Sequence, residues 1–148
     1  MDGTWRDIEL TDLNSLDVEA TGAQVVSFAG REALRLEGGL VLWPEPFAGD
    51  LTIAVEIAAE GACYPGIAFY ADDARSFELV YAQPHTSGLW DALQYDPVFR
   101  GSNTWQIYHG PGHQQATIVP TGSWFRLQVD VVAGQAVASV DGQAPLHV

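Results

Sequence analysis

The feature that most constrains this chain is the alternation of apolar and polar side chains with a period of two residues. Within residues 51–60 one set of alternate positions is apolar throughout: Leu51, Ile53, Val55, Ile57 and Ala59. The other set holds Thr52, Ala54, Glu56, Ala58 and Glu60. Residues 124–131 repeat the pattern, with Phe125, Leu127, Val129 and Val131 set against Trp124, Arg126, Gln128 and Asp130. Such alternation predicts half-buried strands of an antiparallel sheet.

Shorter segments of strand-like composition fill most of the remaining chain. They are Gln24–Phe28, Ala33–Leu36, Leu40–Trp43, Gly66–Tyr70, Phe77–Ala82, Trp105–His109, Gln115–Val119 and Gln135–Val140. Turn residues separate them: Gly30, Gly38-Gly39, Asp72-Asp73, Pro120-Thr121-Gly122, Ala133-Gly134 and Asp141-Gly142. No window shows a convincing helical period. The pattern therefore predicts an all-β, two-sheet antiparallel sandwich, with residues 1–148 forming a single domain because no linker interrupts them.

The charge of the chain limits its partners. Nineteen Asp and Glu stand against six Lys plus Arg, a formal net charge of -13. Phosphate backbones and anionic membrane surfaces are engaged mainly by basic side chains, so we expect neither nucleic acid nor a membrane as a partner. The N-terminus shows neither a basic segment followed by an apolar one nor an apolar run long enough to span a bilayer, which predicts a cytoplasmic chain.

Three stretches carry a pattern in common. The first is Gly66–Tyr70 followed by Phe77–Tyr81, and the last is Gly122–Leu127 leading to Ala136–Gly142. The middle one, which is the most specific, consists of Pro84–Gly88, Asp91–Tyr95, Pro97–Phe99 and Trp105-Gln106. Together they resemble the concanavalin A-like lectin/glucanase superfamily, in particular its bacterial laminin G-like or glycosidase-like domains. The resemblance covers roughly residues 30 to 148 and implies a jelly roll with a carbohydrate-related role.

Two departures from that superfamily bear on function. Its glucanases carry carboxylates at alternate positions of one strand, and no Glu-x-Asp-x-Glu-like run occurs here, which weakens a hydrolase assignment. Its members also continue with a further strand beyond the position of Val148. We therefore expect either that the first thirty residues close the sheet differently or that a sheet edge stays open for a partner strand.

The longest segment without clean alternation, residues 83–103, is expected to be a long loop, where function concentrates on a β scaffold. The candidate ligand-binding residues lie in and beside it: His85, Trp90, Asp91, Gln94, Tyr95, Asn103 and Trp105. Planar amides and carboxylates bind pairs of sugar hydroxyls, and aromatic rings stack on the C–H face of a sugar. The alternative is that Asp91 and Asn103 cap turns while Tyr95 and Trp105 fill the core beneath the loop.

Metal, cofactor and thiol chemistry are not favoured. His109 and His113 lack the further ligands of a structural zinc site, and Asp72-Asp73 is explained more simply by a tight turn than by calcium. Cys63, the only cysteine, has no basic neighbour to activate it and is expected to be inert. The sequence predicts no metal and no cofactor.

Three functions remain open. The leading hypothesis is a module that binds a carbohydrate, a glycoconjugate or another polar small molecule without hydrolysing it. The second is an enzyme acting on a sugar or small polar substrate, with His85 as base and Asp91 orienting it. The third is an assembly module that forms a homodimer by strand addition at an open sheet edge.

Overall fold

The computed structural model describes residues 4–104 and 107–148. The chain divides into two compact units, Met1–Pro46 and Phe47–Val148, each of which is described by itself. Within the described ranges the regular elements are β-strands and two short 3-10 helices, η1 (Leu13–Ser15) and η2 (Pro84–Thr86). No described helix is long and apolar enough to cross a membrane.

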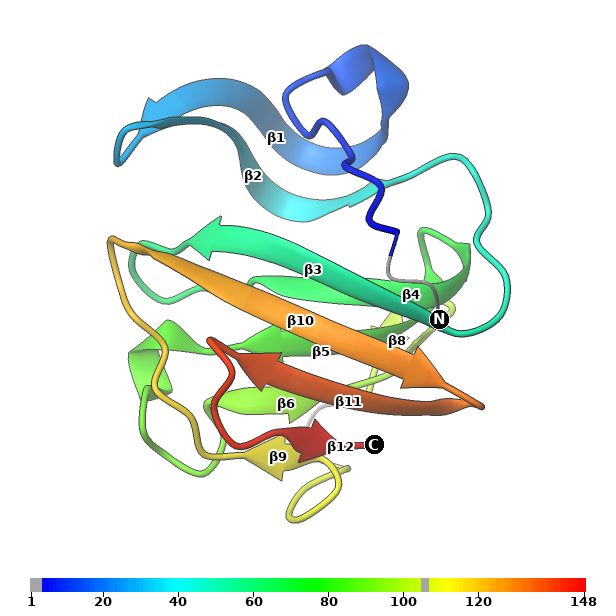
Figure 1. Ribbon diagram of the computed structural model, residues 1–148, viewed down its shortest axis with the longest axis vertical. Coiled ribbons are helices and arrows are strands. Elements are labelled where there is room, and N and C mark those ends of the chain that lie inside the picture. Colours follow the sequence, from blue (N-terminus) through cyan, green and yellow to red (C-terminus); the bar gives the residue numbers. More distant parts are fainter. Residues whose placement is uncertain (1–3, 105–106) are drawn as a thin grey trace. The chain divides into compact units, whose positions relative to one another are not determined.

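The first unit is a long antiparallel hairpin. Strand β1 (Asp17–Phe28) pairs with β2 (Arg31–Leu42) over nearly its whole length, from Asp17 opposite Leu42 to Phe28 opposite Arg31. The reversal occurs at Ala29-Gly30, whose φ angles of 45° and 79° are both positive, as two-residue hairpin turns require. Figure 1 shows that both strands of the hairpin are strongly curled. The three short strands expected within 24–43 are therefore parts of two long ones.

The expected turn at Gly38-Gly39 was wrong, because both glycines lie inside β2. Gly39 faces Ala20, and a Cβ built on it would lie 2.1 Å from the carbonyl oxygen of Glu19. The two strands approach one another here more closely than any side chain permits. These glycines therefore serve strand pairing rather than a reversal.

The second unit contains two antiparallel sheets. In the first, the order is β12 (Leu146–His147), β11 (Gln135–Val140), β10 (Trp124–Val132) and β3 (Leu51–Ala58). Phe125 lies opposite Ile57 and Leu127 opposite Val55, so the apolar sets of the two alternating segments share one face. The turn between β10 and β11 is Ala133-Gly134, with φ angles of 50° and 79°. The sequence prediction for this sheet is confirmed.

The second sheet is built around β5 (Ser76–Ala82). It pairs with β4 (Gly66–Asp73) on one side and with β6 (Leu93–Tyr95) and β7 (Val98–Phe99) on the other. Strands β8 (Ser102–Asn103) and β9 (Gln114–Gln115) complete it, beside β7 and β6 respectively.

Residues 83–103 were expected to form a long loop, yet they contain three short strands. Val80 lies opposite Tyr95 and Phe77 opposite Val98, so β6 and β7 follow one line along β5. Pro97 stands between them without an N–H to donate, which interrupts the ladder but does not redirect it. Of the expected strand Gln115–Val119, only Gln115 belongs to β9 (Gln114–Gln115). Of the expected strand Trp105–His109, residues 105 and 106 lie outside the described residues, and residues 107–109 are not strand.

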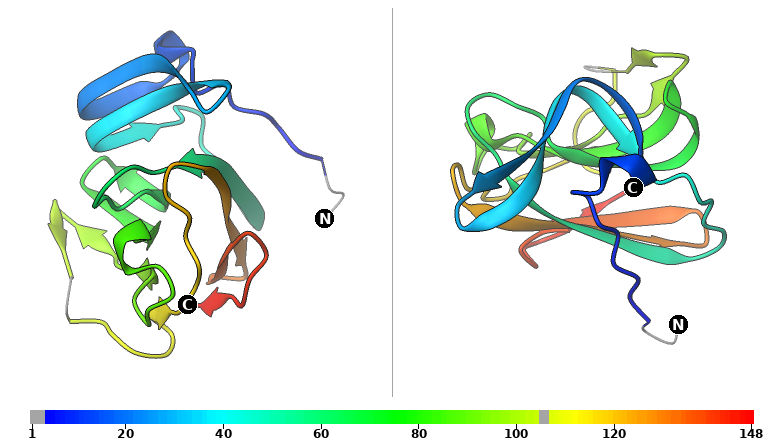
Figure 2. Two further views of the ribbon diagram at one scale, coloured as in Figure 1. Left: turned by 90° about the vertical axis from the view of Figure 1, so that its left-hand side faces the viewer. Right: turned by 90° about the horizontal axis from the view of Figure 1, so that it is seen from above.

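The two sheets of the second unit enclose a common core, in a sandwich-like arrangement whose layers face one another in Figure 2. Fully buried side chains of the first sheet include Phe125, Leu127 and Val129 from β10. Val80 from β5 and Leu93 from β6 belong to the same cluster. Side chains of both sheets thus bury each other, which is what a sandwich of half-buried strands requires.

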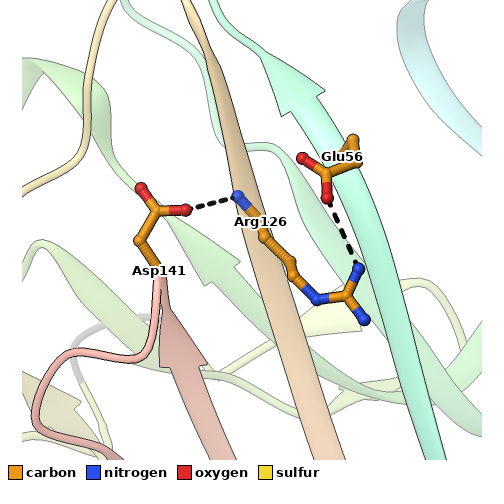
Figure 3. Close-up of polar contacts among 3 residues, drawn as sticks. All are labelled: Glu56, Arg126 and Asp141. Carbon is orange, nitrogen blue, oxygen red and sulfur yellow. Dashed lines mark hydrogen bonds and ion pairs between the residues drawn. The ribbon is translucent and has the colours of Figure 1, made fainter.

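The face of the first sheet that points away from the core is solvated. There the guanidinium of Arg126 on β10 forms an ion pair of 3.4 Å with Glu56 on β3, and each side chain is 43% exposed (Figure 3). The backbone N–H of Arg126 donates to Asp141 at 2.8 Å, which fastens the turn after β11 to β10. This is an ordinary outer face, with long polar side chains reaching into water.

Candidate functional site

The register of the second sheet shows which side chains lie on its outer face, the face that points away from the core. Val80 and Leu93 point into the core, and successive side chains of a strand point to opposite faces, so Tyr81 and Gln94 point away from it. Tyr81 lies opposite Gln94, and Gln94 lies opposite Gln114. These three side chains therefore form one row across β5, β6 and β9.

This outer face is polar but buried. Tyr81, Gln83, Gln94 and Asp96 are each 5% exposed. None of the four points into the core, and two of them bond to residues outside the strands: Gln83 to the carbonyl of Asp91, and Asp96 to Thr104. Buried polar groups need hydrogen-bond partners, and the partners found here divide the four residues into two classes.

The glutamines hold loops. Nε2 of Gln83 donates to the carbonyl oxygen of Asp91 at 2.7 Å, and Nε2 of Gln94 donates to the same oxygen at 3.2 Å. Nε2 of Gln114 donates to Oε1 of Gln94 at 3.2 Å, and the N–H of Gly110 donates to Oε1 of Gln114 at 2.7 Å. This chain of amides connects residue 91 on one side of the sheet with residue 110 on the other.

Asp96 fastens the segment that follows β8. Its Oδ1 accepts from the backbone N–H of Thr104 at 2.9 Å and from the hydroxyl of the same residue. Asp96 lies two residues after Gln94 and therefore on the same face. Its N–H donates to the carbonyl of Leu79, so it continues the pairing with β5. Its carboxylate is thus fixed at a diagonal position to Tyr81.

Tyr81 occupies the centre of this face, and its hydroxyl has no hydrogen bond to any residue that the structure describes. Burial, together with the negative charges of Asp96 and Asp91, raises its pKa from 10 to about 12. The phenol therefore stays protonated at neutral pH and can donate a hydrogen bond. The backbone of Asp91 is held near this row, because its carbonyl oxygen accepts from Gln94, which lies opposite Tyr81.

One exposed ring borders Tyr81, and a second exposed ring borders the first. The ring of Tyr64, in the loop before β4, meets that of Tyr81 edge-on at 5.9 Å between centroids. The His85 ring meets Tyr64 edge-on at 5.3 Å. Tyr64 is 61% exposed, so aromatic surface continues from solvent down to the buried Tyr81.

Asp91 brings a carboxylate with unused hydrogen-bonding capacity. Its Oδ1 is buried and has no hydrogen-bond partner. A buried carboxylate oxygen without a donor is costly, and a ligand that supplies a donor removes that cost. We name the residues Tyr64, Tyr81, His85, Asp91 and Asp96 the Tyr81 site.

The residues singled out from the sequence fall into three groups. Gln94 lies opposite Tyr81 with both ends of its amide engaged, Asp91 is joined to Gln94 through its carbonyl oxygen, and His85 contacts the ring of Tyr64. Trp90, beside Asp91, is 64% exposed. Tyr95 and Asn103 lie apart from these residues.

Tyr95 points to the opposite face of the sheet from Gln94. Its hydroxyl donates to Glu78, and burial together with this bond raises its pKa well above the ordinary value. Its ring stacks on His113 at 6.2 Å. Asn103 is exposed on β8 beside β7, and Trp105 lies outside the described residues.

The sequence reasoning missed Tyr64, Tyr81 and Asp96. Tyr81 ends a strand whose alternation assigns Val80 to the core, so the opposite face was open to inspection. Asp96-Pro97 was taken for loop because proline ended the apparent strand. Nothing in the sequence near Tyr64 indicates that its loop folds toward β5.

No group of three or more His, Cys, Asp or Glu within 4–104 and 107–148 is arranged to hold a metal ion. The imidazole of His113 instead contacts two tyrosines, Tyr95 and, at 5.0 Å, Tyr108. Burial raises the pKa of the Cys63 thiol. The Tyr81 site is therefore a set of hydrogen-bonding and aromatic groups.

Comparison of the chain with protein-family models, with curated protein sequences and with solved structures gave no match.

Proposed function

We propose that the second unit is a jelly-roll module that binds a carbohydrate or a similar hydroxyl-rich ring compound at the Tyr81 site. The observation that carries the proposal is the contrast between burial and hydrogen bonding on this face. Oδ1 of Asp91 is buried without a donor, and the side chains of the neighbouring row, Tyr81 and Gln94, are each 5% exposed.

Each member of the site has a role in such binding. The carboxylates of Asp91 and Asp96 accept hydrogen bonds from ligand hydroxyls, and the protonated phenol of Tyr81 donates one. The exposed ring of Tyr64 offers a flat apolar surface for the C–H face of a sugar. The amides of Gln83 and Gln94 position Asp91 and do not contact the ligand.

Binding is favoured over catalysis by the state of His85. An acid–base pair needs His85 and Asp91 within hydrogen-bonding reach, and no such bond joins these two described residues. The contact that His85 makes is with the ring of Tyr64. In the proposed module, His85 thus supports an aromatic surface.

Titration of the whole chain with a panel of oligosaccharides, followed by isothermal calorimetry or by saturation-transfer NMR, tests the proposal. We expect at least one oligosaccharide to bind, and Tyr81→Phe to weaken its affinity roughly tenfold through loss of one buried hydrogen bond. The matched control is Tyr70→Phe, because Tyr70 is 56% exposed on β4 and outside the site. Equal affinity in wild type, Tyr81→Phe and Asp91→Asn contradicts the proposal.

A further inference from the structure

Strand β3 is the outermost strand of the first sheet in the second unit. It pairs with β10, which lies between β3 and β11 (Figure 1), and no described strand pairs with its other side. The carbonyl oxygen of Ala59 accepts from the N–H of Gly122, which lies on the β10 side. Because successive residues direct their backbone groups to alternate sides, the even-numbered residues of β3 present theirs at the free edge.

The apolar core is incomplete along this edge. On β10 the inner side chains Phe125, Leu127, Val129 and Val131 are at most 1% exposed. The residues of β3 that lie opposite them are only partly buried: Ile57, Val55, Ile53 and Leu51. A strand added beside β3 would therefore extend the hydrogen-bonded ladder and also cover apolar side chains.

Strand β3 lacks the features by which edge strands avoid pairing with other chains. Its register with β10 is unbroken from Leu51 to Ala58, and it contains no glycine, proline or lysine. Its one charged residue, Glu56, forms an ion pair with Arg126 of β10, which offsets the charge (Figure 3). This edge is open to a partner strand.

The other outer strands of the second unit are protected. Strands β8, β9 and β12 are each two residues long. Strand β4 is longer, but its register with β5 shifts between Phe69 and Asp73, and Tyr70 in this interval has a φ angle of 47°. Irregular pairing and acidic residues such as Asp72 and Asp73 protect an edge. Among the described strands of this unit, β3 is thus the only long and regular edge.

The sequence of β3 is complementary to itself in an antiparallel arrangement centred on Ala54. Residues 51–57 of one copy then pair with residues 57–51 of the other, and even-numbered residues, whose N–H and C=O groups are free, lie opposite each other. On the inner face, Leu51 meets Ile57 and Ile53 meets Val55, so every pair is apolar. Such pairs stabilise a sheet.

Glu56 selects this register over its neighbours. Registers centred on Ile53 or on Glu56 pair fewer residues, and they place Glu56 opposite Asp50 or opposite its own copy. A register centred on Val55 pairs as many residues but puts the two Glu56 side chains at diagonal positions, within reach of each other. In the register centred on Ala54, Glu56 lies opposite the uncharged Thr52, and like charges stay apart.

We propose that two copies of the chain associate through their β3 edges, with Ala54 opposite Ala54 on the two-fold axis. The four strands of each copy then form one continuous sheet. A single pair of strands is a small interface, so we expect the dimer to dissociate on dilution. This inference is independent of the proposed function, because it concerns the first sheet alone.

Sedimentation velocity of the whole chain over a range of concentrations tests the proposal. We expect a monomer–dimer equilibrium. Ala54→Pro should weaken association roughly tenfold or more, because it removes both N–H donors at the axis and no bond to β10. The matched control is Ala58→Pro, the same change on the same side of β3 but beyond the paired residues. It should leave association unchanged.

Charge exchange at position 54 provides variants that keep the backbone of β3 intact. Ala54→Glu and Ala54→Arg each place like charges opposite one another, which should weaken association roughly fivefold. An equal mixture of the two variants should associate again, because Glu then lies opposite Arg. This recovery is expected only where residue 54 faces its own copy.

Hydrogen exchange locates the interface. The N–H groups of Thr52, Ala54 and Glu56 should become protected as the dimer forms, whereas those of Ile53 and Val55, which point to β10, are protected at every concentration. A monomer at about 1 mM, a dimer that Ala54→Pro leaves intact, or a mixture without recovery overturns the proposal. Protection of the even-numbered residues in a monomer also overturns it, since the edge is then covered within one chain.

Discussion

The outer faces of the two sheets in the second unit are built from similar residue types and have opposite fates. On β3 and β10 the ion pair of Glu56 with Arg126 is 43% exposed on both sides. On β5 and β6 the side chains of Tyr81 and Gln94 are 5% exposed. Both faces are polar, and these side chains are buried only on the second. Burying polar groups has a desolvation cost. A ligand that forms hydrogen bonds with such groups lowers this cost, so a buried polar face is a candidate binding site.

The difference originates in the connections. In the first sheet, β10 and β11 are joined directly by the tight turn Ala133-Gly134. The strands of the second sheet are joined by longer segments. Side-chain amides of glutamines in or next to its strands form hydrogen bonds with these segments. The carbonyl of Asp91 receives two such amides, one from Gln83 and one from Gln94.

The largest effects are expected where the sheets do not differ, in the shared core. Leu93→Ala in the second sheet and Leu127→Ala in the first should each lower the free energy of unfolding by about 2–5 kcal/mol, since both side chains are fully buried. Denaturant unfolding followed by circular dichroism measures both. A loss below about 1 kcal/mol for Leu93→Ala would mean that the second sheet does not share the core.

The inner faces could be predicted from sequence, whereas the covered outer face could not. Alternation alone assigns Phe125, Leu127 and Val129 to the core, because the period of a strand is local. Burial of Tyr81 depends on loops that fold back from distant positions, and no local pattern encodes it. Asp91 was singled out as a ligand-binding residue, but its unpartnered Oδ1 is a property of the folded chain.

A smaller effect separates the two outer faces. Gln94→Leu removes the donor to the carbonyl of Asp91 and the acceptor of the Gln114 amide, leaving two groups with one partner fewer. We expect the free energy of unfolding to fall by about 1–3 kcal/mol. Gln128→Leu on β10 is the matched control, because the amide of Gln128 bonds to Asp130 of the same strand and Gln128 is less buried than Gln94. Its effect should stay within about 0.5 kcal/mol.

Hydrogen exchange distinguishes loss of the amide chain from general destabilisation. In Gln94→Leu the protection of the Gly110 N–H, which bonds to Gln114, should fall before that of the core strand β10. Equal effects of Gln94→Leu and Gln128→Leu on stability would mean that water reaches the two outer faces equally. The difference in burial between the faces would then no longer support the Tyr81 site.

The smallest effect is confined to high pH and concerns Tyr81 itself. Because folding raises its pKa from 10 to about 12, the folded chain holds this proton more tightly than the unfolded chain. Stability from this group is therefore intact below pH 10 and declines as the pH rises toward 12. In spectrophotometric titration, Tyr81→Phe should lack the phenolate that wild type forms near the upper value. If the missing phenolate instead titrates near 10, the ordinary tyrosine value, water reaches the hydroxyl freely, and the outer face of β5 resembles that of β10 after all.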